Sequence, residues 1–165
     1  MMRYLGDSSM KKNTIKKWIK RFSIMMIIVI SIIFLVPKIV TYRRHLAKEN
    51  IIDLALENKT LLDESIQNEN YENALVLEWI EDTHMWKNDS EELVVEFYST
   101  GYGIVSASIY TGIYYASSDK PIGFQGFADE LTWNKKGWEW KEANGDNWYY
   151  TEKIADHWYY YEAGF

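Results

Sequence analysis

Histidine and carboxylate side chains are the first candidates for chemistry in this sequence, and their spacing argues against catalysis. The three histidines are His45, His84 and His157, and none stands three or four residues from another, as a helical zinc site requires. Acids occur in adjacent pairs such as Glu81-Asp82, whose carboxylates point to opposite faces of a strand and cannot act together as acid and base. Cysteine is absent, which excludes thiolate sites and disulfides. The sequence therefore predicts a protein that is not an enzyme and that uses no metal or cofactor.

Aromatic side chains supply a second kind of chemistry, the stacking of rings on sugars or cations. Residues 146–152 (DNWYYTE) and 156–162 (DHWYYYE) are alike at an offset of ten, and a weaker copy at 138–140 (WEW) precedes them. In a strand, Trp and the residue two positions later share a face. An exposed aromatic face marks an interaction site, whereas a sheet packed on both faces would bury the same rings, and the sequence leaves both open. The candidate ligand face consists of Trp138, Trp140, Trp148, Tyr150, Trp158 and Tyr160.

The turn after the first aromatic pair decides how the pairs meet. A two-residue turn at Asn144-Gly145 would place Trp140 opposite Tyr149, whereas a three-residue loop with a bulge would place it opposite Tyr150. The sequence does not choose between these registers.

Gly137-Trp138, Asn144-Gly145 and Trp148-Tyr149-Tyr150 together resemble the choline- or glucan-binding repeats of Gram-positive cell-surface proteins. Those repeats alternate a Gly-Trp with a Trp-Tyr-Tyr or Trp-Tyr-Phe hairpin. The likeness covers about thirty residues, and the ten-residue period of this chain is shorter than the period of those repeats. The resemblance implies that aromatic rings stack on a sugar or a quaternary ammonium group.

An apolar run that begins at Phe22 predicts a membrane-spanning helix over residues 22–42. No charged residue lies between Phe22 and Pro37, and a helix that is apolar on every side belongs in lipid. A cleaved signal peptide is the alternative, but the end of the run lacks a small-residue cleavage site. The expected anchoring side chains are Phe22, Ile27, Ile30, Phe34 and Val36.

The charges on the two sides of this run predict its orientation. Residues 1–48 carry eleven Lys and Arg against one acid, a charge of +10, whereas residues 49–165 carry seven Lys against twenty-three acids, a charge of −16. The positive-inside rule then keeps the basic segment 1–21 in the cytoplasm and places the C-terminal domain outside the plasma membrane. The residues that set this topology are Lys11, Lys12, Lys16, Lys17, Lys20 and Arg21.

Beyond the anchor, the pattern predicts a helical juxtamembrane stalk over 43–70 and a small antiparallel β domain over 71–165. The stalk is expected to be a spacer whose second helix, Thr60 to Ile66, opens with a capping box of Thr60 and Asp63. Turn clusters between aromatic and β-branched segments indicate an all-β meander, with a first hairpin turn at Asn88-Asp89. The expected strands are Ile80–Trp86, Leu93–Tyr98, Ser106–Ala116, Ile122–Phe124, Trp138–Glu142, Asn147–Lys153 and His157–Ala163.

The basic start, uncleaved anchor, short stalk and aromatic end are together similar to small single-pass membrane proteins of Gram-positive bacteria. This resemblance implies a location in the cell membrane and no particular activity. The expected partners are the lipid bilayer and an envelope protein, and the acidic outer domain excludes nucleic acid. We expect a non-catalytic binding module, with a glycan- or choline-binding module and a structural or accessory envelope protein as the alternatives.

Overall fold

The structure of the chain is a computed structural model that describes residues 6–87, 91–102, 108–123, 126 and 131–165. The chain divides into two compact units, one ending at Ala47 and the other running from Lys48 to Phe165. Helix α1 (Gly6–Glu57) contributes residues to both units. The second unit starts well before residue 71, so its helical residues pack with the sheet and are more than the spacer that the sequence suggested.

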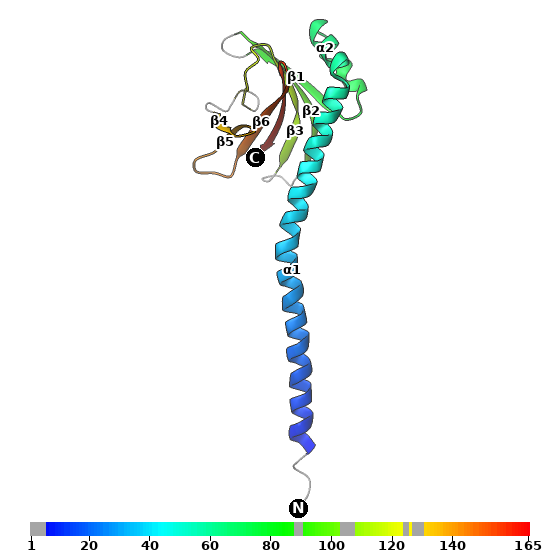
Figure 1. The fold of residues 1–165 in the computed structure, drawn as a ribbon, viewed down its shortest axis with the longest axis vertical. Helices are drawn as coiled ribbons and strands as arrows, with labels where there is room; N and C mark the ends of the chain where they lie inside the picture. Colours follow the sequence, from blue (N-terminus) through cyan, green and yellow to red (C-terminus); the bar gives the residue numbers. More distant parts are fainter. Residues whose placement is uncertain (1–5, 88–90, 103–107, 124–125, 127–130) are drawn as a thin grey trace, which may run out of the picture. The chain divides into compact units, whose positions relative to one another are not determined.

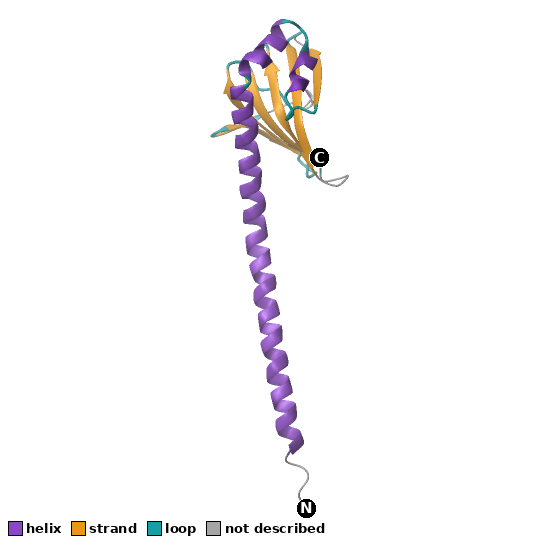
Figure 2. Ribbon diagram, turned by 90° about the vertical axis from the view of Figure 1, so that its right-hand side faces the viewer, coloured by secondary structure: helices purple, strands orange, loops and turns teal. Residues whose placement is uncertain are grey.

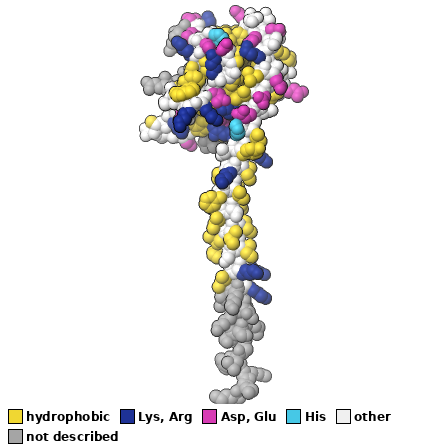
Figure 3. All heavy atoms as spheres, in the orientation of Figure 1, with side chains coloured by type: hydrophobic (Ala, Val, Ile, Leu, Met, Phe, Trp, Pro, Cys, Tyr) yellow, Lys and Arg dark blue, Asp and Glu magenta, His cyan; other side chains and the backbone are white. Residues whose placement is uncertain are grey.

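The first unit consists of an apolar helix, as predicted. From Lys17 to Glu57, α1 is long and apolar enough to cross a membrane, a property that a signal sequence shares, and its most apolar stretch has no buried residue. The helix continues through Pro37. Figure 3 shows apolar side chains along this helix, with Lys and Arg side chains at both ends of the apolar stretch. The predicted anchoring residues Phe22, Ile27, Ile30, Phe34 and Val36 are all exposed.

The basic residues before the apolar stretch lie on the same helix. Lys17, Lys20 and Arg21 are exposed. Lys11, Lys12 and Lys16 are on α1 as well, in the part whose side chains are not described. The predicted cluster therefore lies on helical turns that precede the apolar stretch.

Two short helices follow in the second unit, α2 (Lys59–Gln67) and the 3-10 helix η1 (Tyr71–Val76). The second helix is where the sequence placed it, but the predicted capping box is wrong. The N-cap residue of α2 is Asn58, and it makes no side-chain cap bond. Asp63 instead accepts hydrogen bonds from Lys59 Nζ at 2.6 Å and from Trp158 Nε1 at 2.9 Å. A tertiary contact with the sheet therefore takes the carboxylate that the local pattern assigned to the cap.

Seven antiparallel strands form one sheet, in the order β1-β2-β3-β7-β6-β5-β4 (Figure 1). The prediction of an antiparallel sheet is confirmed, but two meanders meet where one was expected, because β3 pairs with β7. All seven residues of β7 are buried, so this strand requires a neighbour on each edge. The strands are β1 (Asp82–Lys87), β2 (Leu93–Tyr102), β3 (Ile109–Ala116), β4 (Thr132–Asn134), β5 (Gly137–Lys141), β6 (Trp148–Ala155) and β7 (Trp158–Gly164).

Three details of the predicted strands differ or lie outside the described residues. Strand β4 was missed because it has only three residues, all of them exposed. The expected strand at Ile122–Phe124 is absent at residues 122 and 123, and Phe124 is not described. The start of the expected strand at Ser106 and the turn at Asn88-Asp89 also fall outside the described residues.

The two faces of the sheet bury different side chains. One face, called the helical face here, packs against the C-terminal end of α1, α2 and η1, and Figure 2 shows these short helices against the sheet. Its core contains Ile51, Ala55, Leu62, Val95, Phe97, Ile113, Trp158 and Tyr160. The opposite face, called the tyrosine face, buries Val94, Tyr114, Ala116, Tyr149, Tyr159, Tyr161 and Ala163.

Candidate functional site

The tyrosine face carries rings from three neighbouring strands. Tyr114 on β3 stacks on Tyr159 on β7, with ring centroids 5.1 Å apart and planes 8° apart. Tyr149 on β6 stacks on Tyr161 with centroids 6.3 Å apart. Gly112 lies opposite Tyr161, and a Cβ at Gly112 would stand 2.9 Å from the Tyr161 ring and 2.4 Å from a backbone oxygen. Glycine at this position therefore makes room for the ring to lie across β3.

Buried hydroxyls hold one residue of the β3–β4 connection over this face. The backbone N–H of Ile122 donates to the Tyr114 hydroxyl at 2.9 Å, and its carbonyl oxygen accepts from the Tyr149 hydroxyl at 2.9 Å. The Tyr114 hydroxyl also lies 2.9 Å from Thr151 Oγ1. Burial raises the pKa of both tyrosines above the ordinary value of a phenol, so the hydroxyls stay protonated. Ile122 therefore makes no strand pairing because tyrosines bind both of its backbone groups.

A half-open pocket lies beneath Ile122 on the tyrosine face. Its cavity of about 10 Å³ has room for one group the size of a water molecule. The lining residues come from strands β1, β2, β3, β6 and β7 and from the connection, namely Trp86, Val94, Glu96, Tyr114, Ile122, Gly123, Tyr149 and Tyr161.

The pocket contains a buried carboxylate. Glu96 is only 4% exposed, and among the described residues neither its Oε2 atom nor Trp86 Nε1 has a hydrogen-bond partner. Burial raises the pKa of Glu96, while the Tyr161 hydroxyl and the charge of His84 lower it. A buried polar atom without a partner costs about 1 to 3 kcal/mol of folding free energy. This cost singles out the pocket as a candidate binding site.

The six residues of the predicted ligand face do not form one surface. Trp140 lies opposite Tyr149, the register expected for a turn at Asn144-Gly145, and this pairing puts Trp138 and Trp140 on the tyrosine face. Trp148, Tyr150, Trp158 and Tyr160 follow the opposite alternation along β6 and β7, on the helical face. Trp158 and Tyr160 are 2% and 1% exposed, so their rings offer no surface to a ligand, and the other four are half-buried.

The ammonium group of Lys48 lies over two rings of the predicted ligand face. Lys48 Nζ lies 4.8 Å from the centroid of the Tyr150 ring and 5.5 Å from that of Tyr160. The same ammonium group is 2.7 Å from Glu152 Oε2, which also accepts a hydrogen bond from the Tyr150 hydroxyl. Aromatic rings with a carboxylate are the surroundings that a cation prefers. On the helical face, the cation is supplied from within the chain.

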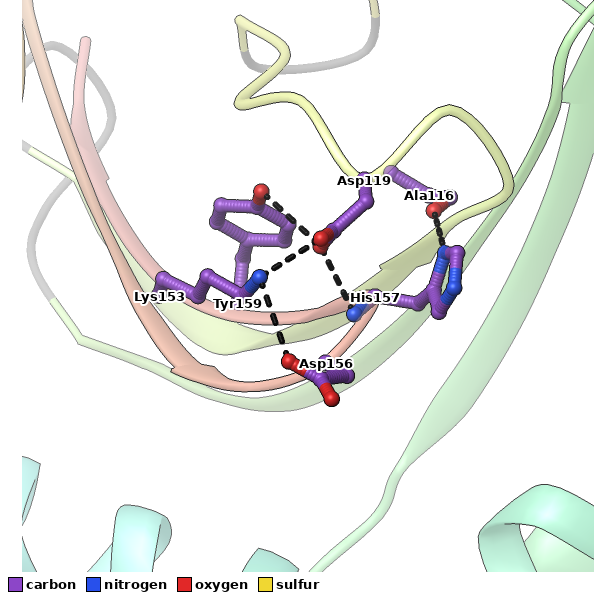
Figure 4. Close-up of polar contacts among 6 residues, drawn as sticks. All are labelled: Ala116, Asp119, Lys153, Asp156, His157 and Tyr159. Atoms are coloured by element: carbon purple, nitrogen blue, oxygen red, sulfur yellow. Dashed lines mark hydrogen bonds and ion pairs between the residues drawn. The ribbon is translucent and has the colours of Figure 1, made fainter.

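A second polar cluster joins the turn after β3 to the turn between β6 and β7, at one end of these central strands (Figure 4). Asp119 accepts hydrogen bonds from Lys153 Nζ at 2.6 Å and from the backbone N–H of His157 at 2.8 Å. The hydrogen bond from Lys153 has the largest effect on the pKa of Asp119 and lowers it, and the hydrogen bond from the His157 backbone lowers it further. The His157 ring is directed to the Ala116 carbonyl oxygen, 3.1 Å from Nδ1. Because Asp119 binds the backbone of His157 and not its ring, the cluster holds the turns together and does not form an acid–base pair.

Within the described part of the chain, no group of three His, Asp or Glu side chains is placed to hold a metal ion. Comparison of the chain with protein-family models, curated proteins and solved structures gave no match. The pocket was missed from the sequence, although one signal was present. Glu96 interrupts the apolar run Leu93-Val94-Val95-Glu96-Phe97, so a charged side chain was bound to lie on a buried strand.

Proposed function

We propose that the chain is a single-pass membrane protein whose second unit is a non-catalytic binding module at the cell envelope. The observation that carries the proposal is the apolar stretch of α1. Its side chains are exposed, and basic side chains lie just before it. Exposed isoleucines and phenylalanines in such number favour a lipid environment. The basic residues Lys17, Lys20 and Arg21 favour a cytoplasmic N-terminus and an extracytoplasmic second unit.

The charge of the second unit supports a basic protein as its partner in the envelope. Residues 48–165 carry eight Lys against twenty-three acids, a charge of −15. A field of this sign speeds encounter with basic partners and repels nucleic acid. The glycan or choline alternative has no such support, because Lys48 covers the rings of Tyr150 and Tyr160.

Membrane fractionation followed by intact-mass measurement tests the anchor. The expected result is the uncleaved chain in the membrane fraction after an alkaline wash, with the second unit digested by protease added outside the cell. A mass that corresponds to the chain without its N-terminal helix would show that this helix is a cleaved signal peptide and not an anchor. Protease resistance in whole cells with digestion in lysed cells would reverse the proposed orientation.

Affinity capture at two salt concentrations tests the binding role. The full chain, extracted in detergent, is expected to capture a basic envelope protein at low salt and to lose it at high salt, since long-range attraction is screened. If no protein is enriched over a control membrane protein, the binding role is refuted and the structural or accessory role replaces it.

A further inference from the structure

We propose that the Glu96 pocket on the tyrosine face binds a primary ammonium group. Glu96, Trp86 and the rings of Tyr114, Tyr149 and Tyr161 form the site. The inference goes beyond the binding role proposed above, because it names a site and the chemistry that fills it. It does not depend on whether α1 lies in a membrane.

The buried carboxylate defines the charge of the ligand. Glu96 lines the pocket and its Oε2 atom has no hydrogen-bond partner among the described residues, so an incoming N–H group would satisfy this atom. Hydrogen bonds that join two opposite charges are about twice as strong as neutral ones. A cationic donor therefore gains more from this oxygen than a neutral ligand does.

The aromatic lining favours a cation as well. Trp86 and three tyrosines surround the carboxylate, and the faces of such rings attract positive charge. On the helical face, Lys48 already makes this combination of two tyrosine rings and a carboxylate. The Glu96 pocket repeats the same chemistry without a cation from the described part of the chain.

The size of the pocket selects among cations. A cavity of about 10 Å³ accepts one group of water size, which an –NH3+ group matches. A trimethylammonium group is several times larger and has no N–H to donate to Glu96. Because the pocket is half-open, an alkyl chain can trail from the ammonium group to the surface.

The pH dependence follows from the groups around the carboxylate. Burial favours the protonated form of Glu96 and raises its pKa, so ammonium binding is expected to weaken as the pH falls through that raised value. The titratable groups that face Glu96 from the neighbouring strands are Asp82, His84, Tyr114, Tyr149 and Tyr161. The charge of His84 opposes the effect of burial, because it lowers the pKa of Glu96.

Two-dimensional NMR of the indole N–H groups tests the site in the full chain in detergent micelles. The Trp86 resonance, identified by its loss in Trp86→Phe, is followed while methylammonium chloride or tetramethylammonium chloride is added at constant ionic strength. We expect a saturable shift with methylammonium, with a dissociation constant on the order of 10 mM because the ligand is so small, and no saturable shift with tetramethylammonium. No saturable shift with methylammonium, or an equal response to both cations, would overturn the proposal.

Two variants separate the pocket from the general acidity of the domain. Glu96→Gln keeps the shape of the side chain and is expected to weaken methylammonium binding about tenfold or more. Glu142→Gln removes the same charge from an exposed turn and is expected to leave binding unchanged. Equal affinity of the Glu96→Gln variant and the unmodified protein would also refute the site. The selectivity between the two cations in the unmodified protein tests the site even if the Glu96 variant does not fold.

The source of the ammonium group is distinguished in the same assay. Blocked lysine, N-acetyl-lysine amide, is compared with its trimethyl-lysine counterpart and with methylammonium. Binding of blocked lysine at least as tight as that of methylammonium would identify a lysine side chain of a protein partner. Binding of methylammonium alone would identify a small free amine.

Discussion

Leu62→Ala tests whether the helical residues belong to the folded domain. Leu62 on α2 is 1% exposed and lies in the core of the helical face with Val95, Phe97 and Ile113. Truncation of a buried leucine removes its transfer free energy and leaves a cavity, together about 3 kcal/mol within a range of 2 to 5. If residues 43–70 were a spacer, the same change would cost almost nothing.

The assay is guanidinium unfolding of the full chain in detergent micelles, followed by tryptophan fluorescence. Leu56→Ala is the matched control, because Leu56 stands in the neighbouring helix and is 45% exposed. We expect the midpoint to fall clearly for Leu62→Ala and to move little for Leu56→Ala, in keeping with about 0.5 kcal/mol at surface positions. Equal midpoints for the two variants would refute the conclusion that α2 packs on the sheet.

Three further changes test the polar contacts. Lys48→Met leaves Glu152 without its 2.7 Å ion pair and is expected to lower the unfolding free energy by about 2 kcal/mol. An unchanged unfolding free energy in the same guanidinium titration would show that the Lys48 cation contributes nothing to stability. Tyr114→Phe removes the acceptor of the Ile122 N–H, so a loss of about 1 to 3 kcal/mol and faster hydrogen exchange at that amide are expected; unchanged exchange would contradict the hydrogen bond. Because the pKa of Asp119 is lowered in the folded protein, its ionised carboxylate stabilises the fold above the ordinary pKa of an aspartate. This stabilisation is lost as the pH falls through the lowered pKa. Thermal melts between pH 2 and 7 are therefore expected to show a shallower acid decline in Asp119→Asn, and parallel declines would refute this.

Local patterns predicted the elements that depend on local sequence. The apolar stretch after Phe22 indicates a helix by composition alone, and β5, β6 and β7 lie within one or two residues of the expected strands. The capping box at Thr60 and Asp63 failed because Trp158, distant in sequence, binds Asp63. The prediction of a single meander failed for the same kind of reason, since β3 pairs with β7, a strand distant in sequence.

The candidate site was less accessible to sequence reasoning than the fold. A charge at position 96 within an apolar strand could be read from the sequence, but its surroundings could not. The pocket requires Ile122 to be held over the sheet by Tyr114 and Tyr149, which come from different strands. The aromatic repeat was interpreted as one ligand face, although alternation along paired strands divides its members between two faces.

The central place of β7 has a consequence for how the domain is made. Strands β1 to β3 and β4 to β6 are synthesised before β7, yet each set has an unpaired edge until β7 fills the gap between them. Pairs such as Tyr110 with Ala163 join residues more than fifty positions apart, and contacts of such long range form slowly. When the chain leaves the ribosome or crosses a membrane from its N-terminus to its C-terminus, the two half-sheets therefore remain unpaired until β7 arrives. Their exposed edges are sites that chaperones bind and proteases cut.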